Sequence, residues 1–87
     1  MTKKHFEIIA NDLNTRAIKV ISTESSYEEK WFGLFTLEQL VIDFVNSFNK
    51  LNINFDDSKF IQSCGVSKLK RELEREQATK IASGVFN

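Results

Sequence analysis

The fold is decided by one stretch of the chain, which reads Thr36-Leu37-Glu38-Gln39-Leu40-Val41-Ile42-Asp43-Phe44-Val45-Asn46-Ser47-Phe48-Asn49-Lys50-Leu51. Its apolar residues recur at spacings of three and four over about four turns, which is the spacing of one face of an amphipathic helix. The residues of that face are Leu37, Leu40, Val41, Phe44, Val45, Phe48 and Leu51. The pattern predicts a long helix at the centre of the domain.

The start of this helix has two alternatives. Ser26 with Glu29 and Thr36 with Gln39 both have the spacing of a capping box, and Gly33 lies between them. A glycine inside a helix costs about 1 kcal/mol relative to alanine. This cost favours a break at Gly33, with a short helical turn before the main helix. One long helix through the glycine is the alternative.

The N-terminal segment also has helical spacing, with Thr2 as a candidate N-cap. The apolar residues of its inner face are Phe6, Ile9, Ala10 and Leu13. Beyond Asn14 the pattern could extend this helix, or residues 18–23, which are rich in β-branched types, could form a short strand, but the chain offers no second strand for them to pair with. We therefore expect helical or irregular structure there, followed by a polar loop over residues 22–26.

A turn and a short helix are expected after the central helix. Residues 52–54, Asn-Ile-Asn, have the composition of a turn, and Asp56 or Asp57 can cap the helix that follows. Gly65 supplies the left-handed residue that ends it. We expect Phe55 to enter the core after the turn. The residues expected to pack together from the short and central helices are Phe60, Cys64, Phe44 and Phe48.

The last helix is predicted to run from Lys68 to about Ala82, with Ser67 as its N-cap. It is dense in charged residues, and pairs such as Lys70 with Glu74 have the spacing of an ion pair worth about 0.2–0.5 kcal/mol. Its apolar stripe is narrow and consists of Leu69, Leu73 and Ile81. The stripe suits docking on the bundle or pairing with a second copy, so a homodimer through this helix is open.

These segments predict one all-α domain over residues 1–87, with a core in 3–65 and the charged C-terminal helix at about 67–83. The expected architecture is a small three-to-four-helix bundle of orthogonal or irregular arrangement. A chain of this length buries a modest share of its surface. The eight phenylalanines therefore supply much of the expected core.

Composition narrows the classes of function. Twelve basic and twelve acidic side chains give a net charge of zero, which removes the overall attraction to nucleic acid or membrane surfaces. The charge is uneven, because residues 1–20 and 66–87 are each basic while the middle is acidic. A single cysteine, no secretory signal and no apolar run of about 20 residues favour a soluble cytoplasmic protein without disulfides or membrane spans.

No catalytic, metal or cofactor site is expected. The adjacent acids Asp56 and Asp57 fit helix capping better than acid–base chemistry. His5 and Cys64 lack a third ligand, and Cys64 falls on the apolar side of its helix. The three glycines are too far apart in the sequence to form a phosphate loop. The sequence therefore favours a protein that is not an enzyme.

Two groups of residues are candidate binding surfaces. Trp31, Phe32 and Phe35 place three aromatic rings within five residues, more than one helix face can hide without a bend. We favour the core for all three rings, and an exposed protein-binding patch is the alternative.

The second group belongs to a segment, from Gly65 to Lys80, that has the order of a helix-turn-helix unit. Its candidate contacts to nucleic acid are Lys68, Lys70, Arg71 and Arg75. Glutamates at 72, 74 and 76 would repel the phosphates, so DNA binding is the less favoured function.

Residues 3–13 and 36–65 resemble small helical proteins encoded by tailed bacteriophages and prophages, whose function is unknown. The residues that carry the resemblance are Phe6, Ala10, Phe44, Asn52, Phe55, Asp56, Phe60, Cys64 and Gly65. This chain has Ile53 where those proteins usually have proline, and its helix beyond Gly65 is an addition that many of them lack.

The resemblance implies a phage or prophage accessory protein in the cytoplasm of an infected or lysogenic bacterium. We expect it to act by binding a host or phage protein, as an inhibitor of a bacterial defence system such as an anti-CRISPR protein does. Nucleic acid is a less favoured partner, and no membrane or cofactor is expected.

Overall fold

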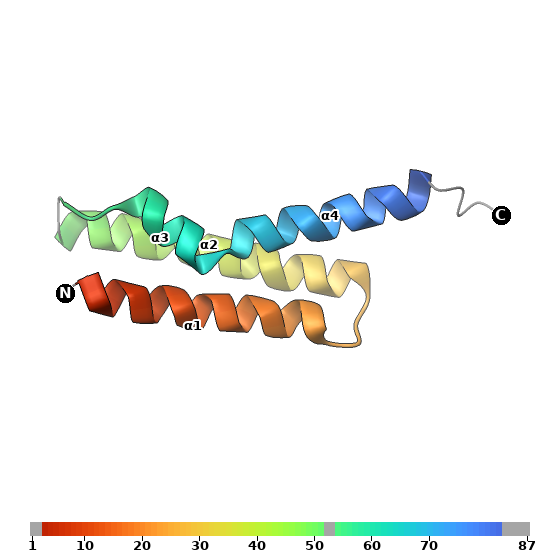
Figure 1. The fold of residues 1–87 in the computed structure, drawn as a ribbon, viewed down its shortest axis with the longest axis horizontal. Coiled ribbons are helices and arrows are strands. Elements are labelled where there is room, and N and C mark those ends of the chain that lie inside the picture. Colours follow the sequence, from red (N-terminus) through yellow and green to blue (C-terminus); the bar gives the residue numbers. More distant parts are fainter. Residues whose placement is uncertain (1–2, 52–53, 83–87) are drawn as a thin grey trace.

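The computed structural model describes residues 3–51 and 54–82, and these residues form four α-helices (Figure 1). No strand occurs in this part of the chain. The structure therefore confirms the predicted all-α helical bundle. The helices are α1 (Lys3–Ser22), α2 (Tyr27–Leu51), α3 (Asp57–Cys64) and α4 (Val66–Ala82).

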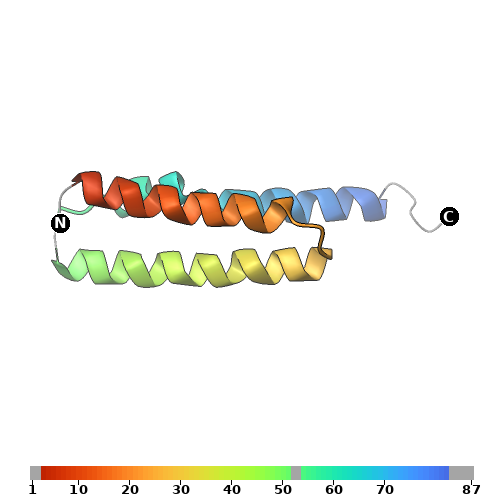
Figure 2. The same cartoon turned by 90° about the horizontal axis from the view of Figure 1, so that it is seen from below.

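The helices share one long axis. Helices α1 and α2 run antiparallel. Helices α3 and α4 follow one another in the direction of α1 and form a third layer (Figures 1 and 2). Helix α3 packs mainly on α1, whereas α4 packs mainly on α2. The described molecule measures 54 × 21 × 16 Å. The expected orthogonal or irregular arrangement is thus wrong, because a single residue joins α3 to α4 and keeps them nearly in line.

Helix α1 continues without a break through residues 14–21. Val20 and Ile21 are accommodated in the helix because both pack against the core near the fully buried Ala17, whereas Ile18 is exposed. Asn14, a poor helix former, uses its side-chain amide to donate a hydrogen bond to the Cys64 carbonyl at 3.0 Å. The candidate cap Thr2 lies outside the described residues.

Helix α2 begins at the first of the two capping sites. The Ser26 hydroxyl accepts a hydrogen bond from the Glu29 N–H at 3.2 Å, as a capping residue does. The helix then continues through Gly33, so the favoured break is wrong. Thr36 does not cap a helix, since its hydroxyl donates to the Phe32 carbonyl one turn earlier.

Gly33 stays in the helix because α1 passes close to it. A Cβ at this position would lie 2.8 Å from Cγ1 of Val20, closer than two carbon atoms can approach without a shift. The absence of a side chain therefore lets the two long helices pack closely. This contact between helices offsets the intrinsic helix cost of glycine.

Both ends of α3 agree with the sequence prediction. Asp56 is the N-cap, and its carboxylate accepts a hydrogen bond from the Lys59 N–H at 3.0 Å. Gly65 ends the helix in the left-handed conformation, with a φ of 65°, and donates its N–H to the Ile61 carbonyl. Asn54 lies in a turn, whereas residues 52 and 53 of the expected turn lie outside the described residues.

Helix α4 begins at Val66, directly after Gly65, so Ser67 is inside the helix and the prediction of a Ser67 cap is wrong. The Gly65 carbonyl already accepts a hydrogen bond from the Leu69 N–H. The predicted ion pair of Lys70 with Glu74 is also not formed, because Lys70 pairs with a glutamate of α2 instead.

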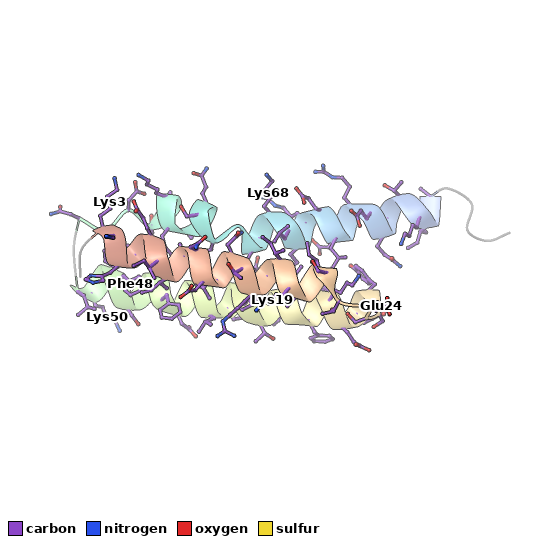
Figure 3. The ribbon with its side chains drawn as sticks, turned by 60° about the horizontal axis from the view of Figure 1, so that its bottom comes forward. Lys3, Lys19, Glu24, Phe48, Lys50 and Lys68 are labelled. Atoms are coloured by element: carbon purple, nitrogen blue, oxygen red, sulfur yellow. The ribbon has the colours of Figure 1, made fainter. Side chains whose placement is uncertain are left out.

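Phenylalanines form the core at the end of the bundle where α1 begins. Phe48, labelled in Figure 3, is buried and has ring contacts at centroid distances of 4.8–5.5 Å with phenylalanines from α1, α2, α3 and the turn before α3. Those partners are Phe6, Phe44, Phe55 and Phe60. Phe60 and Cys64 are buried as predicted, while Phe44 is half-buried.

The buried face of α2 is narrower than its apolar spacing predicts. Leu40 and Leu51 belong to the predicted inner face of α2, but both are exposed, because the buried arc centres on Val41, Val45 and Phe48. Leu34, which the sequence did not single out, is fully buried.

The stripe of α4 is only partly covered. Leu69 and Leu73 pack against the core, and Val66 at the start of the helix is buried. Ile81 is exposed, since the end of α4 projects past the α1–α2 hairpin (Figures 1 and 2).

The close approach at Gly33 predicts an unusual response to Gly33→Ala. In an open helix this substitution stabilises by about 1 kcal/mol. Here the new methyl group meets Val20, so we expect the free energy of unfolding, measured by urea denaturation, to stay unchanged or fall. In a Val20→Ala background, the gain of about 1 kcal/mol should return. An equal gain in both backgrounds would show that the helices do not touch here.

Candidate functional site

The three neighbouring aromatic residues of α2 form one cluster on its surface. The rings of Trp31 and Phe35 stack at a centroid distance of 5.2 Å, and Phe32 meets the Trp31 ring edge-on at 5.5 Å. Trp31 is half-buried, whereas Phe35 is 37% and Phe32 63% exposed. The favoured assignment of all three rings to the core is therefore wrong.

Helix α4 holds the tryptophan in place. The indole N–H of Trp31 donates a hydrogen bond to a carboxylate oxygen of Glu74 at 3.1 Å. The Lys70 ammonium lies 5.2 Å from the Trp31 ring centre and 5.7 Å from that of Phe35, within the range of cation–π attraction. Residues 43 positions apart are thus joined at the surface between α2 and α4.

A carboxylate of α2 completes this contact. Glu38 accepts hydrogen bonds from the Lys70 ammonium at 2.9 Å and from the Ser67 hydroxyl at 2.7 Å. Burial tends to raise the pKa of Glu38, but these two hydrogen bonds and the charge of Lys70 outweigh it and hold the pKa below the ordinary value of 4.5. At neutral pH, the Glu38 carboxylate is therefore ionised, and its hydrogen bonds with Lys70 and Ser67 link the two helices.

The same pair changes the interpretation of the basic residues. The Lys70 side chain is only 16% exposed and is engaged with Glu38, so it does not belong to an open nucleic-acid surface. Lys68, Arg71 and Arg75 recur at i, i+3 and i+7 and are exposed on the outer face of α4, beside Glu72.

A helix-turn-helix unit is not formed at Gly65. Such a unit needs a turn of about three to four residues that sets its helices at a steep angle. Here one residue separates α3 from α4, and the two helices follow the same long axis (Figure 1). The basic side chains of α4 are therefore not presented as a recognition helix.

An apolar surface remains on α2 beside α4. It consists of Phe32, Phe35 and Ile42, and we call it the α2 outer face. Ile42 is 45% exposed and was not among the sequence candidates. Its position seven residues after Phe35, two turns along the same side of the helix, is the signal that could have identified it.

The cysteine thiol is not part of this surface. The Cys64 side chain is buried, and burial raises the pKa of its thiol to about 11, so it is protonated at neutral pH. Within residues 3–51 and 54–82, no three His, Cys, Asp or Glu side chains come close enough to hold a metal ion.

A cavity of about 330 Å³ lies between the start of α1 and the start of α3. Phe6, Ala10, Phe55 and Phe60 form its apolar lining, while its charged side chains are two lysines and two acids. The charges balance, so the cavity favours no ligand of either sign.

Comparisons with protein-family models, curated proteins and solved structures find no match to this chain. None of the helices in the described part is both long and apolar enough to cross a bilayer.

The lowered pKa of Glu38 predicts how its contribution to stability depends on pH. Because the folded-state pKa lies below that of the unfolded chain, the contribution is present above about pH 4.5 and is lost as pH falls through the folded-state value. We expect wild type to exceed Glu38→Gln in unfolding free energy at pH 7, with the difference shrinking below about pH 4.5.

Urea denaturation across this pH range measures the difference. Glu72→Gln, on the outer face of α4, is the matched control and should leave the pH dependence of wild type unaltered. A difference between wild type and Glu38→Gln that is equal at pH 7 and pH 3 would contradict the ionised pair.

Proposed function

We propose that this protein acts by non-covalent binding to another protein through the α2 outer face. The observation that carries the proposal is the position of Phe32, which is 63% exposed and is held edge-on by a half-buried tryptophan. Exposed aromatic rings are favoured anchors of protein interfaces, because each buries a large apolar area. Phe35 and Ile42 extend the apolar area along the same helix.

Order within the cluster adds to its value as an interface. Trp31 is fixed by its hydrogen bond to Glu74 and by its stack with Phe35, so Phe32 packs against a constrained neighbour. Ordering a side chain on binding costs about 0.5–1.5 kcal/mol. A ring that is already positioned by its neighbours loses less freedom when a partner covers it.

The class of partner is proposed from the resemblance of the sequence. Its similarity to small phage and prophage proteins supports a host or phage protein as the partner, in the cytoplasm of an infected or lysogenic bacterium. We propose an accessory protein that inhibits a bacterial defence system, with anti-CRISPR proteins as the leading subclass. A small protein with an exposed aromatic anchor fits inhibition by covering a partner's surface, which needs neither catalysis nor a cofactor.

Affinity capture from bacterial lysate tests this proposal with a matched pair of variants. We expect wild type to recover a protein partner in stoichiometric amount, and Phe32→Ala to lose it. Ile8→Ala removes an apolar side chain that is 51% exposed on α1, and it should retain the partner. Both side chains are exposed, so both variants should melt close to wild type. Failure to capture a partner, or capture that survives Phe32→Ala, would contradict the proposal.

A DNA-binding regulator is the second candidate, because Lys68, Arg71 and Arg75 share one exposed face of α4. The engagement of Lys70 with Glu38 and the glutamate beside that face weigh against it. We therefore expect no mobility shift of duplex DNA at low ionic strength, where even non-specific binders have affinity. A salt-dependent shift that disappears in Arg71→Glu/Arg75→Glu would establish DNA binding instead.

A further inference from the structure

A groove runs between α1 and α2 and is lined only by residues of these two helices. Its apolar lining consists of Ile9, Leu13, Leu37, Leu40 and Phe44. Leu13 is buried, Leu40 is 40% exposed, and the other three are half-buried. On α2 the apolar residues recur at i, i+3 and i+7, so they form one strip along the helix.

The groove is open to solvent and has a volume of about 750 Å³. Its two walls are antiparallel helices that lie side by side (Figure 2). An amphipathic helix places its own apolar residues at i, i+3, i+4 and i+7 and docks in grooves of this kind. A helix seated here would convert the three-layer arrangement into a four-helix bundle.

Charge on the α1 wall indicates which helix fits. Arg16 and Lys19 line the groove, and the described residues give neither of them an ion-pair partner. Asp12 lies on the same wall, which leaves it with a net positive charge. In contrast to Lys70, these two cations are free to pair with carboxylates of a partner.

We infer that the α1–α2 groove binds one amphipathic helix of another protein, with apolar residues at i, i+3 and i+7 and acidic residues on the flank nearest α1. This surface is separate from the α2 outer face, so the inference does not depend on the proposed function.

Neither α4 nor the α2 outer face of a second copy suits the groove. The solvent face of α4 carries Lys68, Arg71, Glu72 and Arg75 and has no apolar strip to insert. The α2 outer face of a second copy has apolar residues, but that contact joins two different surfaces and does not close with twofold symmetry.

The direct test uses two synthetic helical peptides of about five turns. Both have leucine at i, i+3 and i+7 and alanine elsewhere on the binding side; one has glutamate and the other lysine at the flanking positions. In fluorescence anisotropy at low salt, we expect the glutamate peptide to bind at least about tenfold more tightly than the lysine peptide. Equal binding of the two, or binding of neither, would overturn the inference.

Matched variants test whether the peptide binds in the groove. Leu40→Asp should weaken binding of the glutamate peptide by about tenfold or more. Ile42→Asp has similar exposure on the other side of the same helix and should leave the affinity unchanged. Arg16→Glu with Lys19→Glu should reverse the preference between the peptides. Equal losses in the variants at 40 and 42 would overturn the placement.

Three further measurements test the location of the peptide and the identity of the occupant. If Leu40→Asp fails to fold, methyl chemical shifts of the wild-type protein locate the bound peptide instead. Adding the glutamate peptide should change the methyl shifts of Ile9 and Leu40 and leave those of Ile42 unchanged. Phe32→Ala should bind the glutamate peptide as wild type does, which separates this surface from the α2 outer face. Concentration-dependent self-association that Leu40→Asp abolishes would identify a second copy as the occupant and overturn the inference.

Discussion

The left-handed conformation of Gly65 is the constraint on which the third layer of the bundle depends. Its N–H donates a hydrogen bond to the Ile61 carbonyl at the end of α3, and its carbonyl accepts one from the Leu69 N–H at the start of α4. One residue therefore ends one helix and starts the next. A Cβ here would be strained at a φ of 65° and would lie 2.8 Å from the Asn14 amide nitrogen. That amide bonds the Cys64 carbonyl, which ties the junction to α1. The chain thereby passes from covering α1 to covering α2.

Once α4 lies along α2, its docking determines which side chains remain available to a partner. Val66 is the buried apolar residue of α4, Leu69 and Leu73 also pack against the core, and polar contacts add to this attachment. Glu38 holds Lys70 and Ser67, while Glu74 holds Trp31. Trp31 and Lys70 therefore have partners within the molecule. Phe32 on one side of α2 and the α1–α2 groove on the other remain exposed to solvent.

Local rules predicted the helices and most of their ends, because those features depend on neighbours within four residues. Ser26, Asp56 and Gly65 act at helix ends as their chemistry requires. The prediction at Gly33 was wrong because its helix cost is local, but the contact that offsets it comes from Val20 on another helix. The Ser67 cap is wrong for a similar reason. Local chemistry favours serine at a helix start, but the Ser67 hydroxyl donates a hydrogen bond to Glu38, 29 positions away on another helix.

By itself, the sequence determined an all-α chain, the glycine that ends α3 and the aspartate pair that offers its N-cap, and phenylalanines such as Phe48 and Phe60 as core. Periodicity and capping express the backbone's own hydrogen-bonding needs, which each segment satisfies locally. Only the tertiary structure decided that Trp31 is half-covered and Phe32 open, and that Lys70 pairs across helices. Those outcomes depend on which helix lies beside which, and no periodicity within a single helix encodes the identity of its neighbour.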